Sequence, residues 1–221
     1  MQMPTKSIKS FLKESNLTKS EAIQILNEKI SNCQKCKELY SFRQENEYKT
    51  VPGIGNINSK IMIIGEAPGQ NEAKEGKPFV GRAGNLLTNI LKSCGIEREE
   101  IYIANMIKCR PPSNRNPSEE EIDNCRGYLD LQLKVIKPEW IVCLGKIAGQ
   151  NMTNIFEPMS SLRGRIFEYN KIKMIVTWHP AYILRNPSKK SEVWEDFQPI
   201  LRYHHGENYQ NYLDSLKNQS G

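Results

Sequence analysis

Four short apolar runs recur along the chain, separated by segments with helical periodicity. The runs cover residues 60–65, 101–107, 140–145 and 173–178, with the sequences KIMIIG, IYIANMI, WIVCLG and KMIVTW. Continuous apolar runs of this length predict strands buried on both faces of a sheet, as parallel strands are. Alternation of such strands with helices predicts an α/β fold, a three-layer α/β/α sandwich with a central four-stranded parallel sheet.

The segments between the runs carry helix signals. Residues 81–95 place their leucine and isoleucine side chains on one face and end in a glycine suited to a C-terminal cap. A second helix is expected to begin at Asn116 as its N-cap and to end before Pro138, and a shorter helix follows the third run. The sequence RGRIFEYNKIK predicts a hairpin into the last strand, with Asn170 at its turn.

Length and composition suit one domain with short appendages. The chain has 221 residues, of which 38% are hydrophobic, enough for a sizeable core. We expect a helical segment over residues 1–30, a single domain over residues 31–203 that folds as a monomer, and a flexible, polar tail over residues 204–221. The chain shows no apolar stretch near eighteen residues and no secretory signal at its start, so we expect a cytoplasmic protein without membrane contact.

Polar residues gather where the predicted strands end. Glu66 follows the first run, Asn105 lies near the end of the second, and His179 follows the fourth. Ligands of open parallel sheets bind outside the carboxyl ends of the strands. Each of these residues taken alone is more often structural, but three at one rim favour a binding site. In the loop after Glu66, Gly69 permits close backbone approach, and Phe79 is either a core anchor or a stacking platform.

Four of the six cysteines have the spacing of a metal site. Cys33 and Cys36 form a CxxC pair in a polar stretch, and fifteen residues with a proline-rich turn separate Cys109 from Cys125. Thiols in a reducing compartment are more often free or metal-bound than disulfide-bonded. Two pairs supply four ligands, which suit either tetrahedral zinc or a [4Fe–4S] cluster, and the spacing does not separate these. The remaining two cysteines lie in apolar surroundings and are expected to be buried.

Three ordered motifs then carry a family resemblance. They are GEAPGQNEAKEGKPFVGRAGNLL, NMIKCRPPSNRNPSEEEIDNC and WHPAYILRNP. Together with the four cysteines, and over about residues 33–197, they resemble the family 4 uracil-DNA glycosylases, the iron–sulfur branch of their superfamily. The resemblance implies the three-layer fold, a structural [4Fe–4S] cluster on Cys33, Cys36, Cys109 and Cys125, and hydrolysis of uracil from uracil-containing DNA to leave an abasic site.

The resemblance also implies a uracil pocket. A flipped uracil would stack on Phe79, and the Asn105 amide would pair with its O4 and N3 hydrogen. Main-chain amides of the loop containing Ala67 and Gly69 would contact O2, and Glu72 would lie on the side where thymine carries its methyl group.

The implied chemistry needs a donor to the departing uracil and a group that orients water. Cleavage leaves positive charge on the sugar and negative charge on the base, and His179 is expected to donate to O2. The related family 1 enzymes carry an aspartate where this chain has Ala67. Glu66 is therefore the candidate for orienting water, and Glu66, Asn105 and His179 form the expected catalytic set.

Contacts with DNA are expected on both sides of the pocket. By the same resemblance, Ile183 or Leu184 would enter the minor groove as an apolar wedge, with Arg185 near phosphate. The formal net charge of +6 favours a polyanionic partner only modestly. Seven basic residues near the rim are candidates for phosphate contact: Lys77, Arg82, Lys108, Arg110, Arg115, Arg163 and Arg185. Residues 5–12, TKSIKSFL, have the spacing of a peptide that binds a sliding clamp, or are simply the start of an amphipathic helix.

Three alternatives stay open at this point. One is a non-catalytic DNA-binding member of the same superfamily. The second is a relative of different specificity that acts on other deaminated bases. The third is a zinc-bound version of the same fold, which an absorbance near roughly 400 nm, typical of iron–sulfur proteins, would exclude.

Overall fold

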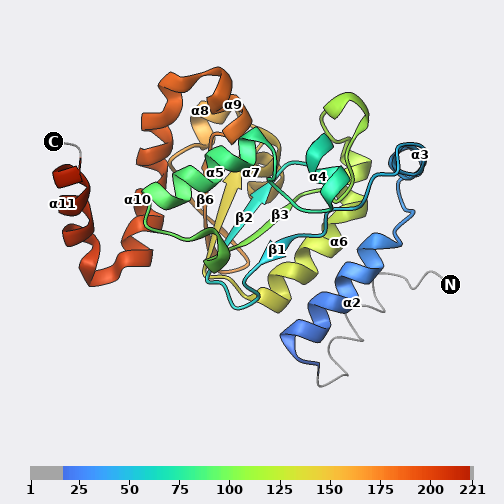
Figure 1. Cartoon of the computed structure of the whole chain (residues 1–221), viewed down its shortest axis with the longest axis horizontal. Helices are drawn as coiled ribbons and strands as arrows, with labels where there is room; N and C mark the ends of the chain where they lie inside the picture. Colours follow the sequence, from blue (N-terminus) through green and yellow to red (C-terminus); the bar gives the residue numbers. More distant parts are fainter. Residues whose placement is uncertain (1–16, 220–221) are drawn as a thin grey trace.

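The computed structural model describes residues 17–219 and contains a six-stranded sheet with helices on both faces (Figure 1). The strands are β1 (Ile54–Gly55), β2 (Ile61–Gly65), β3 (Tyr102–Asn105), β4 (Trp140–Leu144), β5 (Ile166–Tyr169) and β6 (Ile172–Thr177). The helices are α2 (Lys19–Ser31), α3 (Lys37–Glu45), α4 (Gln70–Glu75), α5 (Arg82–Ser93), α6 (Glu119–Ile136), α7 (Lys146–Thr153), α8 (Met159–Leu162), α9 (Pro180–Arg185), α10 (Lys190–His205) and α11 (Tyr209–Gln219). Between residues 17 and 219, no helix is both long and apolar enough to cross a membrane.

The sheet has six strands where the sequence predicted four. Its order is β1-β3-β2-β4-β6-β5, in which β2 pairs in parallel with β3 and β4, and β4 pairs in parallel with β6. Strands β2, β3 and β4 lie within predicted apolar runs, and β6 begins one residue before the run predicted over 173–178. The two additional strands pair antiparallel at the edges. β1 has only two residues and therefore no readable pattern, and β5 is the first arm of the predicted hairpin, whose turn residues Asn170 and Lys171 have φ of 50° and 68°.

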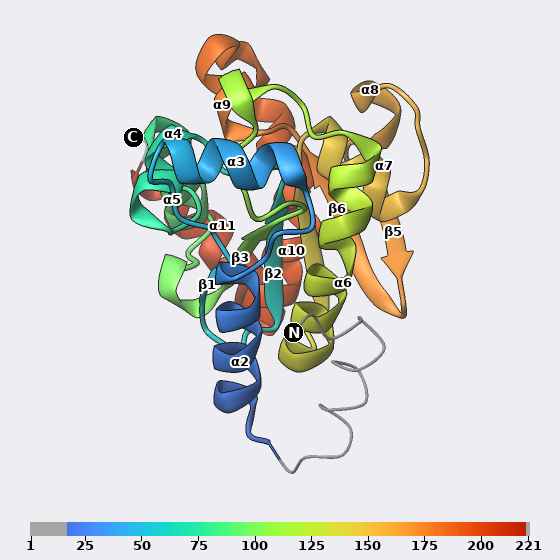
Figure 2. The ribbon, with the colours of Figure 1, turned by 90° about the vertical axis from the view of Figure 1, so that its right-hand side faces the viewer.

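Alternate residues of the strands face two separate apolar clusters. Met62 and Ile64 pack with side chains of α2, α6 and α7, whereas Ile61 and Ile63 pack with those of α5, α9 and α10. Figures 1 and 2 show α2 and α6 side by side along the first of these faces. The central strands are buried throughout because helices cover both faces, as their continuous apolar sequences predicted.

Helix α2 is part of the core. We expected a helical segment over residues 1–30, and α2 is capped by Thr18, whose hydroxyl accepts from the amide of Glu21. Its buried Leu26 and Ile30 join the cluster formed with α6. The candidate clamp peptide, residues 5–12, lies outside the described residues.

Helix α6 begins two residues later than expected. Its N-cap is Ser118 and not Asn116, because Ser118 and Glu121 form a reciprocal capping box. The helix ends at Ile136, and Lys137 follows in the left-handed conformation, just before Pro138.

The C-terminal segment differs from the flexible tail expected over residues 204–221, because residues 209–219 form α11. The ring of His205 stacks on Tyr212, with centroids 3.9 Å apart. The Tyr212 hydroxyl donates to the carbonyl of Ser93, and the Nε2 atom of His205 lies 2.9 Å from the carbonyl oxygen of Cys94. These contacts satisfy carbonyl groups at the end of α5, which no hydrophobic pattern in the tail could indicate.

Candidate functional site

The carboxyl ends of the parallel strands bring the predicted pocket residues together. Gly65 and Asn105 are register partners at the ends of β2 and β3. The ring centroids of Phe79 and His179 are 5.6 Å apart, and both the Phe79 ring and the Asn105 side chain lie against Gly65. Glu66 directly follows Gly65 at the same edge. Side chains from three separate motifs therefore meet at one rim, as the sequence predicted.

Asn105 carries an unsatisfied polar atom into this site. Only 2% of its surface is exposed, and its Oδ1 atom has no hydrogen-bond donor among the residues that the structure describes. Burying an unpaired carbonyl oxygen costs about 1–3 kcal/mol. Such a group is expected where a ligand supplies the donor.

Glycine is required between Asn105 and Phe79. A Cβ atom at Gly65 would lie 2.7 Å from the Cζ atom of Phe79 and closer still to Oδ1 of Asn105. Real Cβ contacts below 3.0 Å are essentially absent from proteins. The missing side chain therefore lets the amide and the ring approach the end of β2.

Phe79 is a core anchor that also forms one wall of the site, and its role as a stacking platform stays a prediction. It is 7% exposed and packs with the α5 cluster, yet its backbone is left-handed, with φ of 54°. Arg98 holds this conformation by donating from one guanidinium nitrogen to the carbonyls of Pro78 and Phe79, at 2.9 and 3.1 Å. The sequence did not identify Arg98, because it lies nineteen positions away and outside the three motifs.

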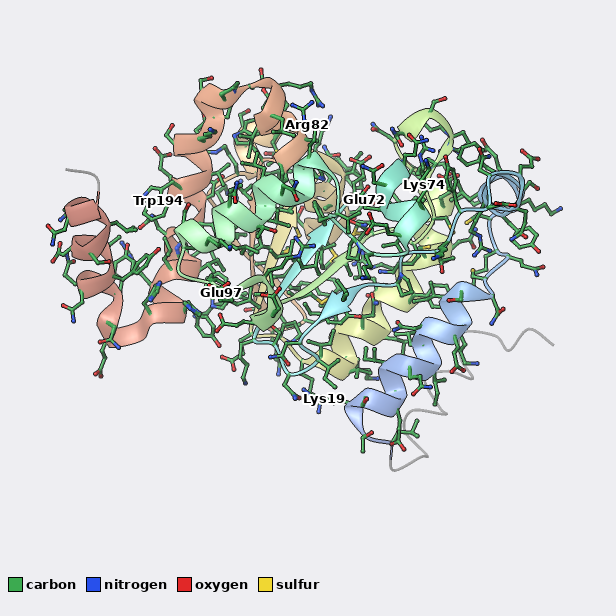
Figure 3. All side chains as sticks on the ribbon, viewed as in Figure 1. Lys19, Glu72, Lys74, Arg82, Glu97 and Trp194 are labelled. Atoms are coloured by element: carbon green, nitrogen blue, oxygen red, sulfur yellow. The ribbon has the colours of Figure 1, made fainter. Side chains whose placement is uncertain are left out.

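Glu72 stabilises the same loop. One of its carboxylate oxygens accepts hydrogen bonds from the amides of Val80 and Gly81, both at 3.0 Å. Figure 3 labels Glu72 on α4 and Arg82 at the start of α5, on either side of this loop. Gly69 is the N-cap of α4 and leads into the short helix that carries Glu72.

His179 is held in a defined tautomer. It is the N-cap of α9, and its Nδ1 atom accepts from the amide of Ala181 at 3.1 Å. A neutral ring that accepts at Nδ1 carries its proton on Nε2. Burial, and after it the positive charge of Arg185, lower the pKa of His179 to about 4, against the weaker opposing effect of Glu72. The ring is therefore a neutral donor at physiological pH.

Trp178, the residue before His179, anchors the segment that carries the histidine. The indole of Trp178 donates to a carboxylate oxygen of Glu192 at 2.7 Å and stacks on Tyr182, with centroids 4.6 Å apart. Helix α10 thereby holds the end of β6 against the start of α9. Neither aromatic residue was singled out in the sequence, although both lie within the third motif.

Glu66 and Ala67 lie at the turn after β2. Burial raises the pKa of the Glu66 carboxyl above its usual value. The carbonyl of Glu66 accepts from the amide of Ile107 at 3.2 Å, which ties the turn to the end of β3. Ala67 packs against the α6 cluster.

The structure separates the two candidate wedge residues. Ile183 is only 1% exposed and packs with α5 and α10, so the expectation that it enters DNA is not supported. Leu184 is 38% exposed and Arg185 is exposed beside it. Consecutive residues of a helix point in different directions, and only one of them faces the core.

Four of the seven basic residues expected at phosphate have internal partners instead. Arg110 donates to Oδ1 of Asn114 at 2.8 Å and to the hydroxyl of Tyr48 at 2.6 Å. Lys108 is buried, Arg163 forms ion pairs with three carboxylates of α10, and Arg115 pairs with Glu38 and Glu121. Basic residues cannot be sorted into paired and free from sequence alone, because their partners are distant in the chain. Three others are exposed: Lys77, Arg82 and Arg185.

A second candidate site lies apart from this rim. Cys33, Cys36, Cys109 and Cys125 line one small pocket between α3 and α6. Burial, and after it the neighbouring sulfur of Cys125, raise the pKa of the Cys36 thiol to about 11 and that of Cys109 to about 12. Within residues 17–219, no group of three cysteine, histidine or carboxylate side chains has the arrangement that would hold a single metal ion. The other two cysteines are buried elsewhere, as expected.

Buried cations adjoin this cysteine pocket. Arg43, only 6% exposed, donates to the carbonyls of Ser31 and Cys33 at 3.0 and 2.9 Å, and its charge opposes the rise in the pKa of Cys109. The main-chain amide of Lys108 donates to the sulfur of Cys125, which likewise opposes the rise in the pKa of that thiol. Four thiols beside two cations fit a group that is bound by thiolates.

Comparison with known proteins gives a consistent result. A family model described as the uracil DNA glycosylase superfamily matches residues 52–198. A type-4 uracil-DNA glycosylase of Archaeoglobus fulgidus is 42% identical over 188 residues, which cover 81% of this chain and 92% of the relative. One from Sulfurisphaera tokodaii is 42% identical over 189 residues, covering 81% and 84%. A type-5 uracil-DNA glycosylase of Pyrobaculum aerophilum is 25% identical over 181 residues, covering 69% and 80%.

Proposed function

Because this chain belongs to the uracil DNA glycosylase superfamily and is a DNA-repair uracil-DNA glycosylase, we propose that the rim formed by Asn105, Phe79 and His179 is its uracil pocket. The buried Oδ1 atom of Asn105, which has no donor among residues 17–219, carries this proposal. The enzyme takes a nucleotide out of the DNA stack, hydrolyses the N-glycosidic bond and leaves an abasic site. Four parallel strands at the centre of a three-layer α/β/α fold position this pocket at their carboxyl ends.

Asn105 reads the base in this proposal. Its Oδ1 atom accepts from N3–H of uracil and its amide donates to O4, whereas cytosine presents the reverse pattern at these positions. The Phe79 ring stacks on the base. Glu72 contributes to thymine exclusion by fixing the loop on which Phe79 stands, which its bonds to Val80 and Gly81 support.

His179 stabilises the departing base. Its Nε2–H donates to uracil O2 as negative charge develops there, and the main-chain amides of Ala67 and Gly69 add donors at the same oxygen. The neutral ring is a donor without needing to be protonated first, which its lowered pKa of about 4 supports. Glu66 orients the attacking water on the sugar side, and the carboxyl is effective in its ionised form.

DNA is bound on the side of α9. Leu184 enters the minor groove and holds the gap left by the flipped nucleotide, with Arg185 near phosphate. The exposure of both residues supports this assignment.

We further propose that Cys33, Cys36, Cys109 and Cys125 hold a [4Fe–4S] cluster. The four thiols around one pocket and the adjacent buried cations Arg43 and Lys108 support it. A cluster held there would cross-link the segment before α3 to the loop before α6 and to α6 itself, and would take no part in bond cleavage. Absorbance near roughly 400 nm with iron and sulfide in equal amounts is expected, and stoichiometric zinc instead would refute it.

The test of the glycosylase site uses matched oligonucleotides that contain U:G, U:A or T:G, followed by alkali to break abasic sites. The full-length protein is expected to break strands at uracil only. His179→Ala and Asn105→Ala are each expected to slow this by about 100-fold or more. His204→Ala on α10 and Asn89→Ala on α5 are matched controls away from the pocket. Intact uracil DNA with the wild-type protein would refute the activity, and unchanged rates in both pocket variants would refute the assignment of residues.

A further inference from the structure

Lys108 is a lysine in an unusual position. It lies between Asn105 and Cys109, and only 1% of its surface is exposed. Removing an ammonium group from water costs several kcal/mol unless hydrogen bonds compensate. The sequence placed Lys108 among the phosphate-binding residues, and its burial excludes that role.

Every polar group of Lys108 has a partner. Its Nζ atom donates to the main-chain carbonyl of Asn105 at 2.7 Å and to Oε1 of Gln132 at 2.8 Å. Its main-chain amide donates to the sulfur of Cys125, and its carbonyl accepts from the amide of Val51 at 2.7 Å. One residue therefore joins the end of β3 to α6 and to the segment before β1.

Lys108 contacts the main chain of Asn105 and not its side chain, so it can orient the amide only by fixing the main chain. The Oδ1 atom of Asn105 has no donor within the described residues, so no hydrogen bond to this oxygen fixes the orientation of the side-chain amide. Around it, Met106 donates from its amide to the carbonyl of Gly65 at 2.9 Å, and Lys108 binds the carbonyl of Asn105 itself. The bonds on either side of the Asn105–Met106 peptide set its plane.

We propose that Lys108 is a positioning residue for Asn105, and that it sets the angle at which the amide meets the base. This inference rests on the proposed uracil pocket. Gln132 also accepts from the ammonium of Lys108 but has a different role. Its own amide donates to the carbonyl of Pro52 at 2.7 Å, which ties α6 to the chain before β1. Loss of Gln132 removes core contacts without releasing the carbonyl of Asn105.

The test separates base reading from general stability. Lys108→Met keeps the length of the side chain and removes its donor, and Gln132→Met is the matched control. For each full-length variant we would measure the Kd for free uracil and the Kd for DNA with an abasic site, which carries no base for Asn105 to bind. Iron content and absorbance near roughly 400 nm on the same samples report any change at the cysteine pocket.

Lys108→Met is expected to bind uracil about tenfold more weakly and abasic DNA with unchanged affinity, while Gln132→Met retains both affinities. In an Asn105→Ala background, Lys108→Met is expected to have no further effect on uracil binding, because the two residues act as one unit. Lys108→Gln serves as a second variant if Lys108→Met does not fold, because the glutamine side chain is too short for its amide to reach the carbonyl of Asn105.

Wild-type affinity for uracil in either folded Lys108 variant would overturn the inference. A parallel loss of affinity for uracil and abasic DNA would also overturn it, because that result indicates a general structural role. A wild-type protein that neither binds uracil nor cleaves uracil DNA would instead refute the proposed pocket, so the two failures are distinguishable.

Discussion

Gly65→Ala is expected to damage the pocket while leaving the fold largely intact. The added methyl group would lie 2.7 Å from Cζ of Phe79, whereas ordinary contacts begin at 3.4 Å. The ring must therefore retreat by about 0.7 Å and the amide of Asn105 by more, and a misplacement of about 1 Å can reduce catalysis by about 100-fold. Overpacking of this kind costs about 1–3 kcal/mol of stability.

The assay is single-turnover cleavage of U:G duplex by the Gly65→Ala variant, with urea unfolding to measure stability. Gly81→Ala is the matched control in the same motif, since its methyl group would meet only side-chain atoms of two residues, Nδ2 of Asn71 at 3.3 Å and Oε1 of Glu72 at an ordinary contact distance of 3.5 Å. We expect a loss of about 100-fold in Gly65→Ala and less than about threefold in the control. Full activity of a folded Gly65→Ala variant would show that the amide and the ring are not constrained as described.

Three further predictions follow from the same contacts. With its pKa lowered to about 4, His179 is neutral above that pH, so the cleavage rate should show no step near pH 6.5, and a rate step centred at 6.5 would contradict this. The stability that this ring contributes is complete above about pH 6.5 and is lost as the pH falls through about 4. Arg98→Met is expected to lose about 1–3 kcal/mol in urea unfolding and to weaken uracil binding, because the carbonyl of Phe79 loses its donor; unchanged stability would show that the bond is dispensable. Leu184→Ala should slow excision from U:A pairs with stability within about 0.5 kcal/mol of wild type, whereas Ile183→Ala should lose about 2–5 kcal/mol; the reverse result would mean that Ile183 leaves the core on DNA.

The sequence predicted the central strands and the residues at their ends well, because both depend on local pattern. Continuous apolar runs mark β2, β3, β4 and β6, and the register of a parallel sheet then brings Asn105 to the end of β2 beside Gly65. Features with weak local signals were missed. The two-residue strand β1 has no period, and helix α11 is held by a hydrogen bond to the end of α5 and by ring stacking on His205 of α10.

Long-range electrostatic partners were the main source of error. Lys108 and Arg163 appeared as basic residues in the sequence, but one is buried and the other binds carboxylates of α10. A lysine that directly continues an apolar run, as in NMIKC, is a signal for burial that the charge pattern concealed. Ile183 and Leu184 could not be separated either, because only the packing of α9 against α5 and α10 shows which of them faces inward.

The cysteine pocket has a consequence for how the protein is made. Cys36 and Cys109 are roughly seventy positions apart, so the pocket forms by closure of a long loop, which is among the slower events of folding. During synthesis the first cysteine pair leaves the ribosome well before the second. Until Cys125 emerges, Cys33 and Cys36 have no partners for a four-thiol site and are accessible to oxidants. Folding of the central sheet is therefore a precondition for completing this pocket, and reducing conditions during expression should raise the yield of correctly assembled protein.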